Sequence, residues 1–173
     1  MSDEFQIEPV STTAQIAAVD ALAREIWYEY YVPLIGRAQV DYMVGKFQSA
    51  EAVAGQIKAG YEYFLVRDEH LPVGYFAIQA QPADGGVFIS KFYLHGSHRG
   101  RGTGRRCMEF IEQLASGRGL VLLWLTVNKA NPSVKAYQRM GFRIAAELEI
   151  DIGSGFVMDD FRMEKQLAPA PLT

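Results

Sequence analysis

Residues 98–106 have the sequence HRGRGTGRR, in which three glycines are separated by single residues. A stretch at 87–94 that is typical of a strand comes shortly before these residues, and a helical pattern at 103–116 begins within them. Glycine adopts backbone conformations that other residues avoid, so a ligand can approach the main chain closely. The N–H groups at a helix N-terminus suit phosphate oxygens, and the arginines of the stretch add positive charge. The pattern therefore predicts a phosphate-binding turn between a strand and a helix.

Two common phosphate motifs do not match this turn. A P-loop requires Gly-Lys and then Ser or Thr after its second glycine, and residues 98–106 contain no lysine. The dinucleotide fingerprint requires glycine at its first, third and sixth positions. The sixth position counted from Gly100 or Gly102 is Arg105 or Cys107. Taken alone, the stretch could also be a glycine-rich connector with surface arginines.

Hydrophobic periodicity predicts the order β-αα(α)-βββ-α-β-α-ββ for the whole chain. Strands are expected at about 5–10, 61–67, 72–81, 87–94, 120–127, 142–152 and 156–165. Helices are expected after the hydroxyl N-caps at 11–13, over about 37–47, between Ser49 and Gly60, over 103–116 and from Pro132 to Gly141.

Three local patterns sharpen this prediction. Pro33 and Gly36 are expected to end the first helix, and Pro132 is expected at the first position of the last one. The run at 120–127 is almost wholly apolar, which is typical of a strand buried on both faces. The sequence therefore predicts an α/β fold, with a mixed, mostly antiparallel sheet flanked by helices on both faces.

Composition limits the class of protein. The chain has 173 residues, of which 49% are hydrophobic and 21% charged, which suits one globular domain over residues 1–167 with a flexible tail at 168–173. A net charge of −3 argues against a nucleic-acid coat, and the single Cys107 excludes an internal disulfide and a cysteine-rich zinc site. The longest apolar run, 119–127, is less than half of the ~20 residues that cross a bilayer. With an acidic start unlike a signal peptide, the chain is expected to be soluble and cytoplasmic, without membrane or nucleic-acid partners.

Two motifs in order carry a family resemblance. Residues 99–104 resemble the R/Q-x-x-G-x-G/A motif with which the GNAT superfamily of N-acetyltransferases binds the pyrophosphate of coenzyme A. Residues 123–131 and 136–142 are similar to the family's second signature, a strand, an asparagine, a helix with a tyrosine, and then Gly-Phe. The order of elements also matches the family from about residue 5 to residue 166. The chain is thus identified as similar to GNAT enzymes, and this resemblance implies acetyl-CoA as the cofactor.

The resemblance also implies where the cofactor binds. The main chain of the strand at Phe92, Tyr93 and Leu94 would pair with the pantetheine arm as an added strand does. The turn would hold the pyrophosphate through Arg99, Gly100, Arg101, Gly102, Thr103, Gly104 and Arg105. In many relatives seven positions separate the asparagine from the tyrosine, but Asn131 and Tyr137 are six apart, so either Asn128 or Asn131 could make the contact.

The same resemblance assigns catalysis to Tyr137, which would contact the cofactor and protonate the departing thiolate; the alternative is a tyrosine packed against the sheet. The base is open, because the positions where relatives carry a glutamate hold Ser90, Lys91 and Thr126. A lysine-like amine has a pKa near ~10.4, so only about one molecule in ~2,500 is neutral at pH 7. We expect a relay through water or desolvation of the amine, assisted by a carboxylate such as Asp159 or Asp160.

An aromatic cluster in the first helices would form the acceptor side in this fold. Its substrate-binding candidates are Trp27, Tyr28, Tyr31 and Tyr42, with carboxylates nearby that would suit a cationic amine; the alternative is core packing. Residues 26–31 and 41–43 are loosely similar to GNAT members grouped with spermidine/spermine acetyltransferases.

The resulting expectation is direct acetyl transfer to a primary amine in a ternary complex, with a small amine or polyamine favoured. The alternatives are a protein or peptide N-acetyltransferase and a non-catalytic acyl-CoA sensor. His95 and His98 lack further ligands at suitable spacing, so no metal site is expected, and Cys107 is expected in the core. The sequence leaves a homodimer open.

Overall fold

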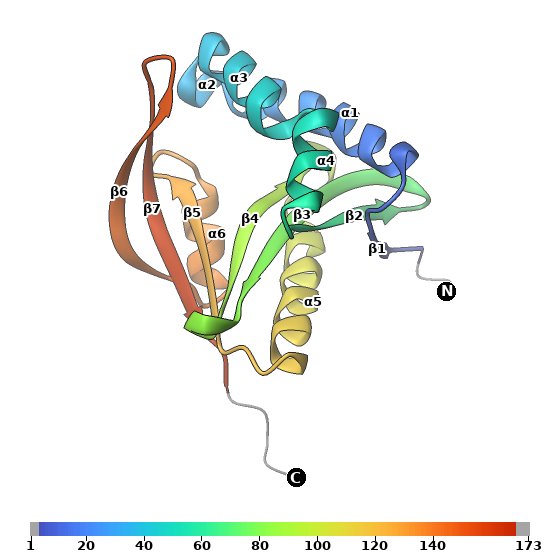
Figure 1. Cartoon of the computed structure of the whole chain (residues 1–173), viewed down its shortest axis with the longest axis vertical. Coiled ribbons are helices and arrows are strands. Elements are labelled where there is room, and N and C mark those ends of the chain that lie inside the picture. The colour runs from blue at the N-terminus through green and yellow to red at the C-terminus, as the bar shows by residue number, and fades with distance from the viewer. Residues whose placement is uncertain (1–3, 169–173) are drawn as a thin grey trace. The chain divides into compact units, whose positions relative to one another are not determined.

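The computed structural model describes residues 4–168 (Figure 1). Apart from Ala168, the predicted tail lies outside the described residues, as do residues 1–3. The helices are α1 (Thr13–Tyr30), α2 (Val32–Ile35), α3 (Arg37–Met43), α4 (Ala50–Lys58), α5 (Thr103–Gly117) and α6 (Ser133–Arg139). The strands are β1 (Gln6–Pro9), β2 (Glu62–Asp68), β3 (Leu71–Gln81), β4 (Gly86–Leu94), β5 (Leu122–Asn128), β6 (Arg143–Gly153) and β7 (Phe156–Gln166). Within the described residues, no helix has the length and apolar character needed to span a membrane.

Hydrogen bonds place the strands in the order β1-β2-β3-β4-β5-β7-β6. β4 and β5 pair in parallel, whereas β1–β2, β2–β3, β5–β7 and β6–β7 pair antiparallel. The predicted fold class, a mixed and mostly antiparallel sheet with helices on both faces, is confirmed.

The chain divides into two compact units, Met1–Gln79 with Lys91–Gly104, and Ala80–Ser90 with Arg105–Thr173. β4 and α5 pass from one unit to the other. The single domain predicted for residues 1–167 stays a prediction.

The first unit buries different aromatic residues on the two faces of its strands. On one face, the Tyr63 hydroxyl of β2 donates to Gln56 Oε1 of α4 at 2.5 Å, and the Tyr93 ring of β4 lies 5.3 Å from the Trp27 ring of α1. On the other face Phe64, Phe76 and Phe92 follow one another across three strands, with ring centroids 5.0 and 6.1 Å apart. Helices therefore meet the tyrosine face, and the phenylalanines form the opposite layer.

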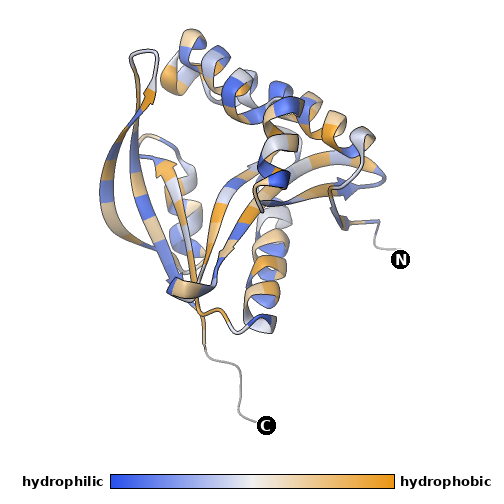
Figure 2. Cartoon of the chain, viewed as in Figure 1, coloured by the Kyte–Doolittle hydropathy of each residue, from blue (hydrophilic) through white to orange (hydrophobic). Residues whose placement is uncertain are grey.

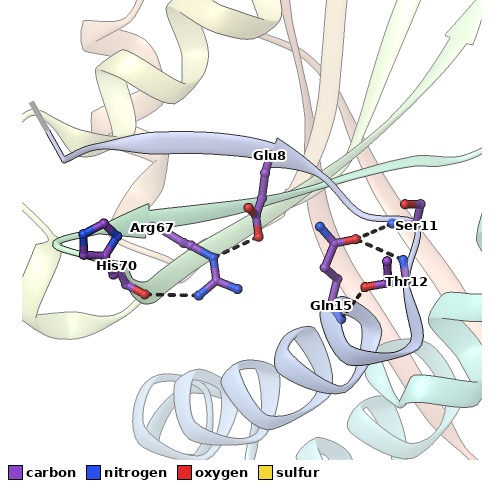
Figure 3. A network of polar contacts seen from close by, with 6 residues as sticks. All are labelled: Glu8, Ser11, Thr12, Gln15, Arg67 and His70. Atoms are coloured by element: carbon purple, nitrogen blue, oxygen red, sulfur yellow. Dashed lines mark hydrogen bonds and ion pairs between the residues drawn. The ribbon is translucent and has the colours of Figure 1, made fainter.

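The start of α1 shows how local sequence fixes an element (Figure 3). The Gln15 N–H donates to Thr12 Oγ1 at 3.1 Å, and Gln15 Oε1 accepts from the Thr12 N–H at 3.0 Å, which is a capping box. Nearby, Arg67 on β2 pairs with Glu8 on β1 at 2.9 Å and donates to the His70 carbonyl oxygen at 3.2 Å. The predicted hydroxyl N-cap is confirmed.

Several predicted helix boundaries were wrong by short distances. Pro33 lies inside the short helix α2, near its N-terminus, where its missing N–H costs nothing. Gly36, with φ +85°, then separates α2 from α3. The helix predicted over 37–47 ends at Met43 and continues as a π-helical turn, Val44–Gln48. Pro132 is the N-cap of α6, one residue before its first helical position.

The second unit covers one face of β5 with helices. Leu123, Leu125 and Val127 are buried, while the residues between them are only half-buried. On the buried side, Lys165 Nζ of β7 contacts Glu112 Oε1 of α5 at 2.5 Å and the Met140 carbonyl oxygen after α6 at 2.7 Å. Figure 2 shows a similar alternation of hydrophobic and hydrophilic residues along β6 and β7.

The prediction that β5 is buried on both faces was therefore wrong. Trp124 lies on the half-buried face, where its ring stacks on Phe88 at 4.1 Å and the Arg162 guanidinium lies 4.0 Å from its centroid. The Phe88 ring and the Arg162 guanidinium shield Trp124, so the run of apolar residues in β5 did not require a second layer of helices.

Gly74 offers a test of the packing that supports β4. A Cβ at this position would lie 2.5 Å from Leu94 Cδ2 and 2.7 Å from the Tyr93 carbonyl oxygen. Because that oxygen belongs to the main chain, Gly74→Ala must displace β4, and we expect it to lower the free energy of unfolding by about 1–3 kcal/mol. Gly55→Ala in α4 is the matched control, since its Cβ would meet no atom within 4 Å. Urea unfolding that shows equal stability for the two variants would contradict the assignment.

Candidate active site

The glycine turn has the backbone geometry that only glycine adopts readily. Gly100 and Gly102 have φ +72° and +83°, and α5 begins at Thr103 directly after them. A Cβ at either glycine would meet no atom within 4 Å, so conformation and not crowding requires glycine. The loop therefore enters a 15-residue helix with an open main-chain surface at both glycines.

The arginines of the turn differ in what they contact. The Arg99 guanidinium donates to the Leu94 carbonyl oxygen at 2.9 Å and lies 4.1 Å from the centroid of the Tyr30 ring. Arg101 reaches the Ser97 carbonyl oxygen at 3.4 Å, which is a long contact. Arg105 is exposed on the first turn of α5. Arg99 thus holds the end of β4 to its own loop, and Arg105 is exposed to solvent.

The loop histidines contact carboxylates. His95 Nε2 lies 3.3 Å from Glu25 Oε1, and His98 Nε2 lies 3.2 Å from Asp68 Oδ2. In the part of the chain that the structure describes, no group of three potential metal ligands comes together.

The pairing of β4 with β5 stops early. It covers Gly86–Phe88 and Leu122–Trp124, and within the second unit Ile89 and Ser90 have no Cα partner on β5 among the described residues. Two strands that diverge leave main-chain groups that need other partners. Within the second unit, the parallel pairing of β4 with β5 thus ends at Phe88 and Trp124.

The structure brings two of the four acceptor candidates together with the predicted cofactor strand. Trp27 stacks on Tyr31 at 4.2 Å, and the Tyr93 ring lies 5.3 Å from Trp27 and 6.0 Å from Tyr31. These three rings form the aromatic cluster of the first unit. Glu25, on the same helix α1 as Trp27, contacts His95.

The other two acceptor candidates lie among surface charges. The Tyr28 hydroxyl is hydrogen-bonded to Asp41, and the Arg37 guanidinium lies 5.4 Å from its ring centroid. The hydrogen bond to Asp41 raises the pKa of Tyr28. Tyr42 accepts a hydrogen bond from Lys46 at 3.0 Å. These contacts join α1 to α3 and α3 to the π-helical turn.

In the second unit, both asparagines shape the start of α6. Asn128 Oδ1 accepts from the Ala130 N–H at 2.9 Å, and Asn131 Oδ1 accepts from the Ser133 N–H at 2.8 Å. Asn131 is buried and Asn128 is half-buried. The choice between them as the cofactor contact stays open.

Tyr137 on α6 is 8% exposed, and its ring meets Phe142 edge-on at 5.8 Å. Its main-chain carbonyl oxygen accepts from the Phe142 N–H at 3.0 Å, which closes the helix before Gly141. The Tyr-x-x-x-Gly-Phe pattern therefore has a structural role at the end of α6. The Tyr137 side chain, which carries the hydroxyl, has only a small exposed area.

Lys91 is a buried lysine that sequence reasoning had dismissed. Its ammonium donates to the Phe47 carbonyl oxygen, to Gln56 Oε1 at 3.0 Å and to the Tyr63 hydroxyl at 2.5 Å, all of which are neutral. Burial lowers its pKa to about 7. The signal that could have found it is its parity: it shares one face of β4 with Tyr93.

Lys91 should make stability rise with pH. Its pKa falls from 10.5 in a free side chain to about 7, so between these values the unfolded chain binds one more proton than the folded protein. Between about pH 7 and pH 10.5 the free energy of unfolding should then increase by up to ~1.4 kcal/mol per pH unit. Below about pH 7 the contribution of Lys91 to this free energy should not change with pH. Lys91→Met should lack this slope. Urea unfolding of both proteins at about pH 8 and about pH 9 measures the difference, and parallel curves would contradict it.

Asp159 and Asp160, the two carboxylates proposed to assist the base, have opposite surroundings. Asp159 is exposed, and its Oδ1 lies 2.9 Å from Lys129 Nζ. Asp160 is 3% exposed and hydrogen-bonded by the Thr126 side chain. Burial and the neighbouring Asp159 raise the pKa of Asp160 to about 6.

Comparison with known proteins agrees with this geometry. A model of the acetyltransferase (GNAT) family matches residues 21–142. The PaiA N-acetyltransferase of Thermoplasma acidophilum, solved in complex with coenzyme A, is 18% identical; the match covers 96% of this chain and 99% of that one with a TM-score of 0.76. A GCN5-related N-acetyltransferase of Rhodopseudomonas palustris is 16% identical over 96% and 99% of the two chains, with a TM-score of 0.80.

A third similar structure is the ribosomal-protein-S18-alanine N-acetyltransferase of Escherichia coli, which is 16% identical over 96% of both chains, with a TM-score of 0.71. At such identities the likeness shows the fold. No curated protein matches the chain by sequence.

The family model covers well over half of the chain, so this protein belongs to the acetyltransferase (GNAT) family. It is an N-acetyltransferase of the class that takes its acetyl group from acetyl-CoA.

Proposed function

We propose that the protein transfers the acetyl group of acetyl-CoA to the primary amine of a small amine or polyamine, by direct attack in a ternary complex. The observation that carries the acceptor class is the aromatic cluster of Trp27, Tyr31 and Tyr93, with the Glu25 carboxylate on the same helix α1. Electron-rich ring faces and a carboxylate attract an ammonium group. An apolar cluster alone would attract no such charge.

The cofactor residues of the first unit fit coenzyme A. The positive-φ glycines and the start of α5 offer main-chain N–H groups for a pyrophosphate. The end of the β4–β5 pairing at Phe88 and Trp124 supports pairing of the pantetheine arm with the main chain at Phe92 and Leu94. Arg99 already donates to the Leu94 carbonyl oxygen, which has a second lone pair for a donor of the arm.

For the chemical step we propose Tyr137 as the acid. The amine nitrogen attacks the thioester carbonyl carbon, the carbon–sulfur bond breaks, and the Tyr137 hydroxyl donates its proton to the departing thiolate. The side chain of this tyrosine is 8% exposed, which limits the access of water that would compete for that proton.

A panel of acceptors tests the proposal. Coenzyme A release is measured by thiol detection with acetyl-CoA and, in turn, alkylamines, polyamines and peptides with free amino groups. The expected result is amine-dependent release that is fastest with small amines or polyamines, and intersecting double-reciprocal lines that indicate a ternary complex. Faster turnover of peptides would contradict the acceptor class, and the similar fold of the S18-alanine enzyme shows that this architecture serves protein substrates too. A homodimer and a cytoplasmic location stay predictions from the sequence.

A further inference from the structure

A chain of hydrogen bonds runs through the loop that joins β4 to the glycine turn. The Ser97 hydroxyl oxygen lies 2.8 Å from His95 Nδ1 and 2.8 Å from His98 Nδ1. At one end of the chain, His95 Nε2 lies 3.3 Å from Glu25 Oε1 of α1. At the other end, His98 Nε2 lies 3.2 Å from Asp68 Oδ2 of β2. All five residues belong to the first unit, so two of its carboxylates are connected through two imidazoles and one hydroxyl.

The contacts of His95 determine where its proton is. Its Nδ1 accepts a hydrogen bond from the Ser97 main-chain N–H at 3.3 Å, so this nitrogen carries no proton of its own. The Ser97 hydroxyl must then donate its hydrogen to the same nitrogen. His95 Nε2 holds the proton of the ring and donates it to Glu25. His95 is thus a neutral imidazole with a partner at each nitrogen.

The remaining contacts require two protons on His98. A serine hydroxyl has one hydrogen, and Ser97 donates it to His95, so the Ser97 oxygen can only accept from His98 Nδ1. The Asp68 carboxylate is also an acceptor, so His98 Nε2 must donate to it. Only the imidazolium form donates from both ring nitrogens. If His98 were neutral, a hydrogen would be missing from one contact of the chain.

The basic side chains on either side of Asp68 contact other carboxylates. Arg67 pairs with Glu8 at 2.9 Å, and His70 Nε2 lies 3.9 Å from Glu4 Oε1. The imidazolium of the loop is therefore the cation that compensates the charge of Asp68.

The loop itself is rich in positive charge. Arg99 and Arg101 lie within three positions of the imidazolium in the sequence. Arg99 donates to the main chain at the end of β4, and Arg101 contacts the Ser97 carbonyl oxygen at 3.4 Å. From α1, the Glu29 carboxylate approaches the loop at Gly96, where an added Cβ would lie 2.8 Å from Glu29 Oε1. Protonation of the imidazole therefore adds a positive charge directly before the turn that is proposed to bind the pyrophosphate.

We infer that the protonated ring of His98 holds the glycine turn in the conformation that binds acetyl-CoA. This inference rests on the proposed function. Because His98 comes directly before residues 99–104, its ring connects the start of the turn to β2 through Asp68 and to α1 through Ser97. Loss of the second proton breaks one of these contacts and removes a charge that attracts an anion. Both effects weaken binding of the cofactor, so its affinity falls as the pH rises. His98 is a positioning residue in this account.

Calorimetry with acetyl-CoA at about pH 6 and about pH 8.5, on either side of the range in which histidines titrate, tests the inference. The Kd of the wild type should rise between these pH values by about 3- to 10-fold more than the Kd of His98→Gln, which has no such proton to lose. The ligand's own phosphate titrates equally with both proteins, so the comparison cancels it. His70→Gln is the matched control, because His70 is 76% exposed and lies in the β2–β3 turn, and it should keep the wild-type pH dependence.

Substitutions at Ser97 separate the hydrogen-bond chain from simple charge. Ser97→Ala removes the hydroxyl that requires a proton on His98 Nδ1, so the pH dependence of Kd should shrink although both histidines remain. Ser97→Thr keeps a hydroxyl and should restore the pH dependence. An equal pH dependence in Ser97→Ala and the wild type would contradict the role of the chain.

Nuclear magnetic resonance of the histidine ring nitrogens supplies a measurement that needs no ligand. At about pH 6.5, long-range ¹H–¹⁵N spectra should show His98 protonated at both nitrogens and His95 protonated at Nε2 only. A neutral His98 at this pH, or the same pH dependence of Kd in the wild type and in His98→Gln, would overturn the inference and leave the proposed function intact. A wild type that binds no acetyl-CoA at either pH would overturn both.

Discussion

A Gly102→Val variant is expected to lose measurable acetyl-CoA binding while its core stays folded. Gly102 has φ +83°, a conformation that costs a β-branched residue about 1–3 kcal/mol or more. Valine would push the turn into another conformation, and the main-chain N–H groups proposed to bind the pyrophosphate would lose their arrangement. Isothermal titration calorimetry with acetyl-CoA measures the effect.

Gly119→Val is the matched control for this loss. Gly119 has φ +74° and, like Gly102, would place a Cβ with no atom within 4 Å, but it lies in the loop after α5. The two variants should lose similar amounts of stability, and only Gly102→Val should lose binding. Unchanged affinity in a folded Gly102→Val protein would remove the glycine turn from the cofactor site.

Tyr137→Phe is expected to lower kcat by about 10²-fold or more, in the range that general acids contribute. The substitution keeps the ring and its edge-on contact with Phe142, so packing should change little. Affinity for acetyl-CoA should change far less than kcat, because under the proposed function the phosphates and the pantetheine arm contact other residues. Rates are measured under conditions in which the chemical step limits turnover.

The acyl donor provides the control for Tyr137. A donor whose leaving thiol is more acidic needs less help from an acid, so the loss in Tyr137→Phe should shrink with it. Equal kcat values for the two proteins with acetyl-CoA would return Tyr137 to a packing role, and coenzyme A would then depart unassisted.

Most elements of the fold could be predicted because their signals are local. The capping box at Thr12 and the Gly153-Ser154-Gly155 turn between β6 and β7 each depend on residues that are close together in the sequence. The β2–β3 turn uses Glu69 and His70 at positive φ, although their residue types do not favour it, and only the pairing of the flanking strands requires it. The prediction that β5 is buried on both faces was wrong for a similar reason. Phe88 and Arg162, which are distant from Trp124 in the sequence, shield its ring.

Some residues of the candidate site could be predicted from the sequence and others could not, for the same reason. The glycine turn could be predicted because closely spaced glycines indicate an unusual backbone conformation, and the positive φ values of Gly100 and Gly102 agree with that prediction. Asp160 was predicted only as one of two candidate carboxylates and Lys91 was set aside, because the burial of both side chains depends on strands and helices far along the chain. Residue types alone also predicted Tyr28 and Tyr42 as acceptor-binding residues alongside Trp27 and Tyr31. In the structure, Asp41 of α3 is a hydrogen-bond partner of Tyr28.

The most direct test of acetyl transfer is mass spectrometry of a polyamine incubated with the purified protein and acetyl-CoA. The predicted result is a polyamine that gains one acetyl group, in an amount equal to the coenzyme A released and only when the protein is present. Coenzyme A release without an acetylated amine, or acetyl-CoA that stays intact across every amine offered while the protein binds it, would contradict the account.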